Sequence, residues 1–293
     1  MLRFAANLDT LFGEVSFLER FARARAAGFD GVECASPYAH PKAALAEQLE
    51  RHSLEQVLLH LPPSDWARGD RGIACLPERR GEFRDGIGLA IEYASALGCK
   101  RVCCWAGIPV SDSPVTGSSV ARSPVASSPA SGVAAGGAAA GTAPKVSSLD
   151  TFVDNMRFAA AALGKAGMQL LIEPINTRDV PGFFLSQSAQ ALSVIEATQS
   201  DNVWLAYDVY HMQVMQGYLV EDIRRCFPKI AHFQIADNPG RHQPGTGEID
   251  YGVVLRLIEQ LGYTGWVGCE YTPVGTSRDA VAWLHTYRRG MNA

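Results

Sequence analysis

Short apolar runs of strand length alternate along the chain with longer amphipathic runs of helical period. Eight runs have strand character, at residues 3–6, 31–33, 56–59, 101–105, 169–173, 203–208, 230–235 and 266–270. Seven have helical character, at residues 17–27, 41–52, 81–97, 149–165, 187–197, 251–261 and 277–289, and only a short helix is expected after the sixth strand. This alternation predicts an α/β fold, a closed (β/α)8 TIM barrel, with an open doubly wound sheet as the alternative. No GxGxxG follows the first strand, so nothing favours the open sheet or a nucleotide cofactor.

One segment differs in composition from the rest of the chain. Between residues 111 and 146, 26 of 36 residues are Ser, Pro, Ala or Gly, without any aromatic residue, Leu, Ile or Met. Such a segment cannot offset an ordering entropy of about 1–2 kcal/mol per residue. We therefore expect residues 1–293 to form a single barrel domain with a flexible insertion at 111–146, after the fourth strand.

Composition narrows the classes of function. The 293 residues are 47% hydrophobic and 19% charged, which is typical of a globular chain with a large core. A net charge of −4 provides no basic surface for nucleic acid, and no run of about 18 apolar residues could span a membrane. The N-terminal residues lack the pattern of a secretory signal. We expect a cytoplasmic protein that acts on a small molecule, and the sequence leaves open whether it forms a homo-oligomer.

The number and the positions of the cysteines fit the expectation of a cytoplasmic protein. There are seven, an odd number, and Cys103 and Cys104 are adjacent within an apolar run. We expect reduced thiols in the core rather than a disulfide framework, and no CxxC spacing indicates a structural zinc site.

Polar residues stand at the ends of seven predicted strands. They are Asn7, Glu33, His60, Glu173, Asp208, Gln234 and Glu270. The carboxyl ends of all strands in a parallel barrel meet on one face, where the active sites of this fold lie. A single carboxylate at such a position usually caps the next helix. Seven polar ends together predict one polar pocket.

Four of these residues offer oxygen atoms from neighbouring strands: Glu173, Asp208, Gln234 and Glu270. Three carboxylates in one pocket repel each other unless a cation is present, and a set of oxygen donors suits Mg²⁺ or Mn²⁺ better than Zn²⁺. The sequence therefore predicts a divalent metal site. The alternative is a carboxylate network neutralised by shared protons and by Arg241.

Several longer motifs add a resemblance to a known family. The segments IEPIN, DVYHMQ, HFQIADNPGRHQPGTGEIDY and GWVGCEY, together with LPPSDWARGDRGIACLP, resemble the hydroxypyruvate isomerase family of the xylose-isomerase-like barrels. The resemblance covers nearly the whole chain outside the insertion. It implies that Glu173 and Glu270 form the acid/base pair and that Asp208 and Gln234 complete the metal shell.

The same resemblance assigns further residues. Related ketose epimerases bind substrate oxygens with residues that match His211 and Arg241, and many of them hold His where this chain has Gln234. The implied reaction removes a proton from C3 of hydroxypyruvate and returns one to C2 of an enediolate, giving tartronate semialdehyde. Arg241 is expected to bind the substrate carboxylate through a bidentate fork. Isomerisation of 2-oxo-tetronate and 3-epimerisation of a ketose are alternatives that use the same residues.

Three further interpretations concern residues around this pocket. His60 is expected to donate to a substrate oxygen or to be a structural residue at a strand end. Glu33 is expected to orient His60 or to bind a substrate hydroxyl, and the alternatives are a carboxylate that supports a neighbouring site residue from behind or one that caps a helix. The long loop 62–77, which contains Trp66 and Arg71, is expected to cover the pocket, with a surface ion pair as the alternative role of Arg71.

A barrel nuclease resembling the endonuclease IV group is disfavoured by the negative charge and the few histidines near strand ends.

Overall fold

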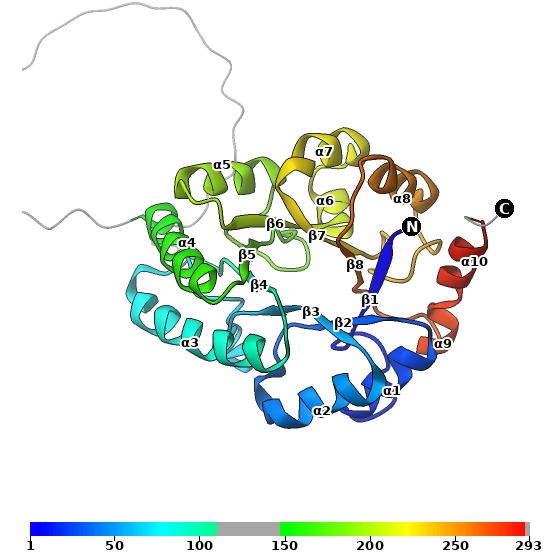
Figure 1. Cartoon of the computed structure of the whole chain (residues 1–293). Helices are drawn as coiled ribbons and strands as arrows, with labels where there is room; N and C mark the ends of the chain where they lie inside the picture. Colours follow the sequence, from blue (N-terminus) through cyan, green and yellow to red (C-terminus); the bar gives the residue numbers. More distant parts are fainter. Residues whose placement is uncertain (110–146, 291–293) are drawn as a thin grey trace, which may run out of the picture.

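The computed structural model describes residues 1–109 and 147–290. Within these ranges eight parallel strands close into a barrel in chain order, and helices surround it (Figure 1). The strands are β1 (Arg3–Asn7), β2 (Gly31–Cys34), β3 (Glu55–His60), β4 (Arg101–Cys104), β5 (Gln169–Ile172), β6 (Val203–Asp208), β7 (Ile230–Ile235) and β8 (Trp266–Cys269). The (β/α)8 barrel is therefore confirmed, and the open sheet is excluded. The insertion expected at 111–146 lies outside the described residues.

The helices follow the strands in the predicted order. The α-helices are α1 (Glu19–Ala26), α2 (Lys42–His52), α3 (Arg80–Ala96), α4 (Ser148–Lys165), α5 (Ser188–Thr198), α6 (Val209–Met215), α7 (Leu219–Cys226), α8 (Tyr251–Gln260), α9 (Ser277–Ala280) and α10 (Ala282–Gly290). Short 3₁₀ helices lie in the connections: η1 (Pro37–Ala39), η2 (Trp66–Arg68), η3 (Pro77–Arg79) and η4 (Phe227–Lys229). The short helix expected after the sixth strand is α6.

Two helical segments differ from expectation. α7 was not predicted because half of its residues are charged, yet it buries Leu219, Ile223 and Cys226. The C-terminal helix, expected as one segment, is two helices, α9 and α10. The Tyr271 hydroxyl donates to the Ala280 carbonyl at 3.0 Å, and the amide of Leu284 bonds to Val281 instead. The carbonyl of Ala280 is thus bonded from outside the helix at the point where the two helices separate.

The core has two parts. The larger cluster fills the space between the strands and the surrounding helices. The smaller cluster consists only of strand residues and lies inside the barrel: Ala5, Val57, Leu58, Cys103, Leu171, Ala206 and Trp266. A barrel of this kind is closed by packed side chains and is not a pore. The polar strand ends lie at the carboxyl end of this inner cluster.

The described residues agree with two further expectations. All seven cysteines are buried and unpaired, as predicted for reduced core thiols. Among the helices in the described ranges, none combines the length and apolar character needed to cross a membrane.

Candidate active site

The barrel brings the carboxyl ends of its last four strands together. Asp208 at the end of β6 pairs in register with Gln234 of β7, which pairs with Gly268 of β8. Glu173 follows the last residue of β5, and Glu270 follows the last residue of β8. The pairing of the parallel strands, with a register shift between Leu205 and Ala206 of β6, therefore places these residues at one end of the barrel, as the sequence predicted.

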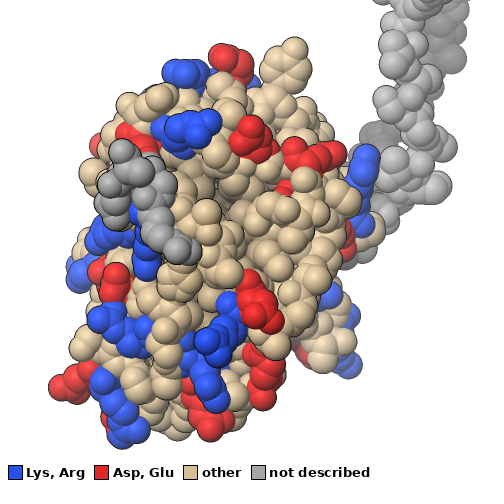
Figure 2. Space-filling view, turned by 90° about the vertical axis from the view of Figure 1, so that its right-hand side faces the viewer, with Lys and Arg blue, Asp and Glu red and all other residues tan. Residues whose placement is uncertain are grey.

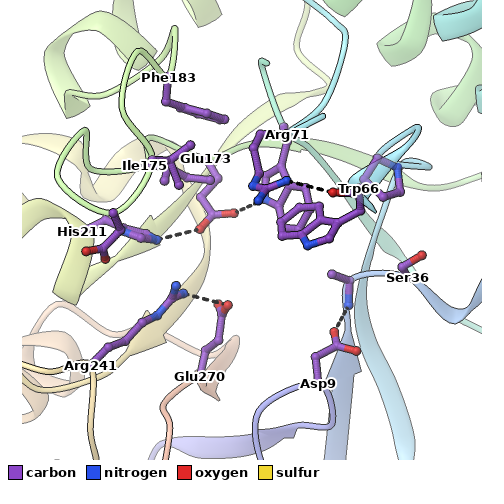
Figure 3. A pocket seen from close by; sticks show the side chains of 15 residues that line it. Asp9, Ser36, Trp66, Arg71, Glu173, Ile175, Phe183, His211, Arg241 and Glu270 are labelled. Carbon is purple, nitrogen blue, oxygen red and sulfur yellow. Dashed lines mark hydrogen bonds and ion pairs between the residues drawn. The ribbon is translucent and has the colours of Figure 1, made fainter. Parts of the chain in front are cut away.

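A cavity of about 570 Å³ opens at this face (Figure 3). Four of the predicted site residues line it: Glu173, His211, Arg241 and Glu270. The other lining residues are Asp9, Ala35, Ser36, Pro63, Trp66, Arg71, Trp105, Ile175, Asp179, Val180 and Phe183. The remaining predicted residues are buried beside the cavity and do not line it: Glu33, His60, Asp208 and Gln234. Its size is within the usual range for a small-molecule site.

Three donors surround the carboxylate of Glu173. Trp105 Nε1 donates to Oε2 at 2.9 Å, and His60 Nε2 lies 3.4 Å from the same oxygen. His211 Nε2 lies 3.9 Å from Oε1. The hydrogen bond from Trp105 holds the carboxylate, and the two histidine rings lie beside it; Figure 3 shows Glu173 and His211 at the cavity wall. The sequence did not single out Trp105, although it follows the fourth strand just as the polar residues follow theirs.

His60 supports Glu173 rather than lining the cavity. It is 3% exposed, and its ring packs 4.5 Å from the ring of Trp105. Its expected hydrogen bond to a substrate oxygen is not favoured by this position. The structural interpretation at a strand end fits better.

His211 faces the site as a neutral donor. Its Nδ1 accepts a hydrogen bond from Asn176 Nδ2 at 2.7 Å, so the ring proton is on Nε2. Burial, together with the nearby charge of Arg241, lowers the pKa of His211 to about 3. The Nε2 proton therefore points toward Glu173 and Asp208, which lies 3.6 Å away.

Arg241 joins two of the carboxylates. Its Nη2 donates to Glu270 Oε1 at 2.8 Å and lies 3.6 Å from Asp208 Oδ2. Burial raises the pKa of Glu270 well above its usual value, and the negative charges of Glu173 and Asp208 add to this, while Arg241 opposes it. Arg241 was expected to bind a substrate carboxylate, but the structure engages its guanidinium with site acids.

Two buried oxygens beside this pair lack hydrogen-bond partners among the described residues: Asp208 Oδ2 and Gln234 Oε1. Ligand atoms of Glu173, Asp208 and His211 lie within 4.8 Å of one another. Unpartnered buried oxygens are costly unless a cation or water satisfies them. The buried His, Glu and Asp cluster is therefore consistent with a metal site. Arg241 supplies part of the positive charge, as in the alternative derived from the sequence.

Glu33 has a different partner from the one expected. It accepts hydrogen bonds from His232 Nε2 at 2.7 Å, Gln234 Nε2 at 3.0 Å and Asn7 Nδ2 at 3.1 Å, and it makes no hydrogen bond to His60 within the described chain. Burial alone would raise the pKa of Glu33, but His232 and the two amide donors hold it below its usual value. The expectation that Glu33 orients His60 is wrong, because His232 reaches it from across the barrel. Glu33 instead accepts the hydrogen bond of the Gln234 amide nitrogen, and the buried Gln234 Oε1 has no hydrogen-bond partner among the described residues.

The variant Gly268→Ala is expected to lower the free energy of unfolding by about 1–3 kcal/mol. An added Cβ would lie 2.4 Å from Glu33 Oε2 and 2.5 Å from Oε1, so the Glu33 carboxylate must leave its hydrogen bonds. Urea unfolding measures the change. Gly81→Ala is the control, because a Cβ there meets nothing within 4 Å. Equal stability of the two variants would contradict the tight packing at Gly268.

The loop between β3 and α3 contributes one wall of the cavity. Pro63, Trp66 and Arg71 line it, in agreement with the expectation that the loop 62–77 covers the pocket. The guanidinium of Arg71 lies 3.9 Å from the centre of the Trp66 ring. The surface ion pair considered for Arg71 is not made with any described residue.

Comparisons with known proteins agree with this geometry. The family model for the Xylose isomerase-like TIM barrel matches residues 21–287. Hydroxypyruvate isomerase of Escherichia coli (strain K12) is 43% identical over 288 residues, which cover 98% of this chain and 100% of that protein. A 2-oxo-tetronate isomerase of Cupriavidus necator is 37% identical over 287 residues, covering 98% and 99%. A crystal structure described as AP endonuclease, family 2 from Brucella melitensis has a TM-score of 0.84 and 38% identity, covering 98% of this chain and 99% of that one. The chain therefore belongs to the hydroxypyruvate isomerase family of xylose isomerase-like TIM barrels.

Proposed function

We propose that this protein interconverts hydroxypyruvate and tartronate semialdehyde (2-hydroxy-3-oxopropanoate). The observation that carries the proposal is the position of Glu173 and Glu270, which come from different strands and line the same cavity. The full-length similarity to hydroxypyruvate isomerase of Escherichia coli supports the substrate class. Two carboxyl groups at one bound molecule are sufficient for a proton transfer between adjacent carbons.

In the proposed reaction, Glu173 removes a proton from C3 of hydroxypyruvate, and the electrons of that C–H bond form the C2–C3 enediolate. Glu270 delivers a proton to C2, and a hydroxyl proton passes from the C3 oxygen to the C2 oxygen. Before the next turnover, Glu173 releases its proton to solvent and Glu270 takes one up from solvent. C3 is oxidised to an aldehyde while C2 is reduced to an alcohol, so no external oxidant is required. The place of Glu270 in the lining of the same cavity, on a different strand from Glu173, supports its role as the second group of the proton transfer. The donors around Glu173 support its role as an oriented base.

Other residues serve the oxygens of the substrate. Neutral His211 would donate its Nε2 proton to a substrate oxygen as negative charge develops there. Glu173, Asp208, Gln234 and Glu270 would hold Mg²⁺ or Mn²⁺, because all four offer the oxygen ligands that these ions prefer. Such an ion, when bound, supplies positive charge that polarises the carbonyl and stabilises the enediolate oxygens. Asp208 Oδ2 and Gln234 Oε1, which accept no hydrogen bond from the described residues, support this ligand set.

A longer keto acid is the second candidate substrate. The cavity is larger than a three-carbon acid requires, and Ile175, Val180 and Phe183 line it with apolar side chains. The relative from Cupriavidus necator is described as a 2-oxo-tetronate isomerase. The same acid/base pair would act on the longer acid, since only the part of the cavity that holds its additional carbon would differ.

A substrate panel in D₂O separates these candidates. The protein is incubated with hydroxypyruvate, 2-oxo-tetronate and a neutral ketose, and NMR follows deuterium incorporation and product formation. We expect the highest kcat/KM with hydroxypyruvate and formation of tartronate semialdehyde. A preference for the four-carbon acid would assign the second candidate. Turnover of the ketose alone would contradict a keto acid isomerase.

A nuclease role is disfavoured despite the name of the relative from Brucella melitensis. The chain has a formal net charge of −4. On the one face that Figure 2 shows, basic and acidic side chains are interspersed with each other. Nucleic acid is attracted mainly by clustered positive charge. A small acid remains the proposed partner of this cavity.

A further inference from the structure

Two arginines line the cavity, and different groups hold them. Arg241 is hydrogen-bonded to Glu270 at 2.8 Å and lies 3.6 Å from Asp208, so acids of the site already match its charge. Arg71 comes from the loop between β3 and α3 and makes no ion pair with residues 1–109 or 147–290. Arg71 is therefore the arginine of the cavity whose charge is not paired with a described acidic side chain, and it is available to an anionic ligand.

The hydrogen bonds of Arg71 leave one edge of its guanidinium available. Nη1 donates to the carbonyl oxygens of Asp70 at 2.8 Å and Trp66 at 3.3 Å. Within the described chain, Nε and Nη2 make no hydrogen bond, and this pair of donors matches the two oxygens of a carboxylate. Stacking on the Trp66 ring at 3.9 Å restricts the side chain before a ligand binds.

Close backbone packing fixes the position of Arg71 relative to Glu173. A Cβ on the next residue, Gly72, would lie 2.2 Å from the carbonyl oxygen of Trp105. The amide of Cys75 also donates to the Ala106 carbonyl at 2.8 Å. Trp105 in turn donates to Glu173 at 2.9 Å. Arg71, Trp66 and Glu173 therefore lie around one cavity on connected segments (Figure 3).

We propose that Arg71 binds the carboxylate of the substrate, so that the reacting carbons lie between Glu173 and Glu270. This inference rests on the proposed keto acid isomerase function and names the group that selects acids. The carboxylate does not change during the reaction, so its contact with Arg71 strengthens binding without entering the proton transfer. Arg71 thereby discriminates keto acids from ketoses that lack a carboxylate.

Binding of an unreactive acid tests this role directly. D-glycerate has the three-carbon chain and the carboxylate but no keto group at C2, so it cannot react. Calorimetry measures its affinity for the wild-type protein and for the Arg71→Gln variant. We expect roughly 10- to 100-fold weaker binding in the variant, the range for loss of a charge-assisted hydrogen bond. Arg71→Lys should give an intermediate value, since it keeps the charge but not the fork.

Arg68→Gln is the matched control in the same loop. The Arg68 side chain is 85% exposed and lies 3.7 Å from Asp65, outside the cavity lining. The affinity of the Arg68→Gln variant for glycerate should equal that of the wild-type protein. Unchanged affinity in Arg71→Gln, or no glycerate binding by the wild-type protein, would overturn the proposal.

Steady-state kinetics test the binding of the substrate carboxylate by Arg71 separately from the proton transfer. Arg71→Gln should raise the KM for hydroxypyruvate by the same factor while changing kcat little. It should not change the inhibition constant of dihydroxyacetone, which lacks the carboxylate. An equal loss of affinity for both molecules would indicate a collapsed cavity and contradict the role of Arg71. If glycerate binding depends on Arg71 but hydroxypyruvate is not turned over, the carboxylate site stands and the proposed reaction fails.

Discussion

Replacing Glu270 with Gln is expected to lower the turnover of hydroxypyruvate by about 100- to 10,000-fold while the fold stays intact. The amide cannot deliver a proton to C2, although it keeps the size of the side chain and can still accept a hydrogen bond from Arg241. Steady-state kinetics measure the loss, and thermal unfolding checks the fold. Glu173→Gln should cause a loss of the same order, because the proposed base is then removed.

The two variants should differ in isotope exchange. With Glu270→Gln, intact Glu173 should still exchange the C3 protons of hydroxypyruvate in D₂O, although isomerisation stops. With Glu173→Gln, both exchange and isomerisation should stop. Glu50→Gln is the control, because Glu50 is exposed on α2, far from the cavity lining. Near wild-type turnover in either active-site variant would refute the acid/base pair.

Replacing Asp208 with Asn is expected to weaken Mn²⁺ binding by at least about 100-fold, more than the usual effect of losing an outer-shell contact. Asp208 Oδ1 accepts hydrogen bonds from the amides of Tyr210 and His211 at the start of α6, and Asn preserves this cap. The unpartnered Oδ2 becomes an amide nitrogen without charge or a ligand lone pair.

Calorimetric titration with Mn²⁺ measures this change independently of activity. Asp201→Asn is the control, since Asp201 is exposed in the turn before β6. Chelation of the wild-type protein should lower turnover, and added Mg²⁺ or Mn²⁺ should restore it. Equal Mn²⁺ affinity of the Asp208→Asn and wild-type proteins would exclude Asp208 as a ligand. A wild-type protein that binds no Mn²⁺ would favour the carboxylate network neutralised by Arg241.

Much of the fold was predictable because the barrel repeats one simple unit. Each strand is a short apolar run, seven of the eight end at or beside a polar residue, and all eight runs were found in the sequence. α7 was missed because Glu221, Asp222, Arg224 and Arg225 give the segment a polar composition. The break between α9 and α10 coincides with the hydrogen bond from the hydroxyl of Tyr271 to Ala280, a tertiary contact that local periodicity does not contain.

The candidate site also combines features that the sequence predicts with features that only the folded chain defines. The grouping of Glu173, Asp208 and Glu270 follows from strand ends and barrel closure alone. The partner of Glu33 does not, because His232 reaches it across the barrel interior from a strand 199 residues away in sequence. Trp105 also escaped notice, since an aromatic residue after an apolar run resembles core. Its importance depends on the direction of its Nε1, which only the folded structure defines.

The close approach of Gly72 and Gly107 has a consequence for engineering. A Cβ on Gly107 would lie 2.6 Å from the carbonyl oxygen of Gly72, and the Gly107 carbonyl accepts the amide of Phe184 at 2.9 Å. The chain leaving β4 is thus clamped from two sides before residue 110. A side chain at Gly107 would therefore push against the backbone next to Arg71, so substitutions at this glycine should disturb the wall of the cavity that carries Arg71 and Trp66.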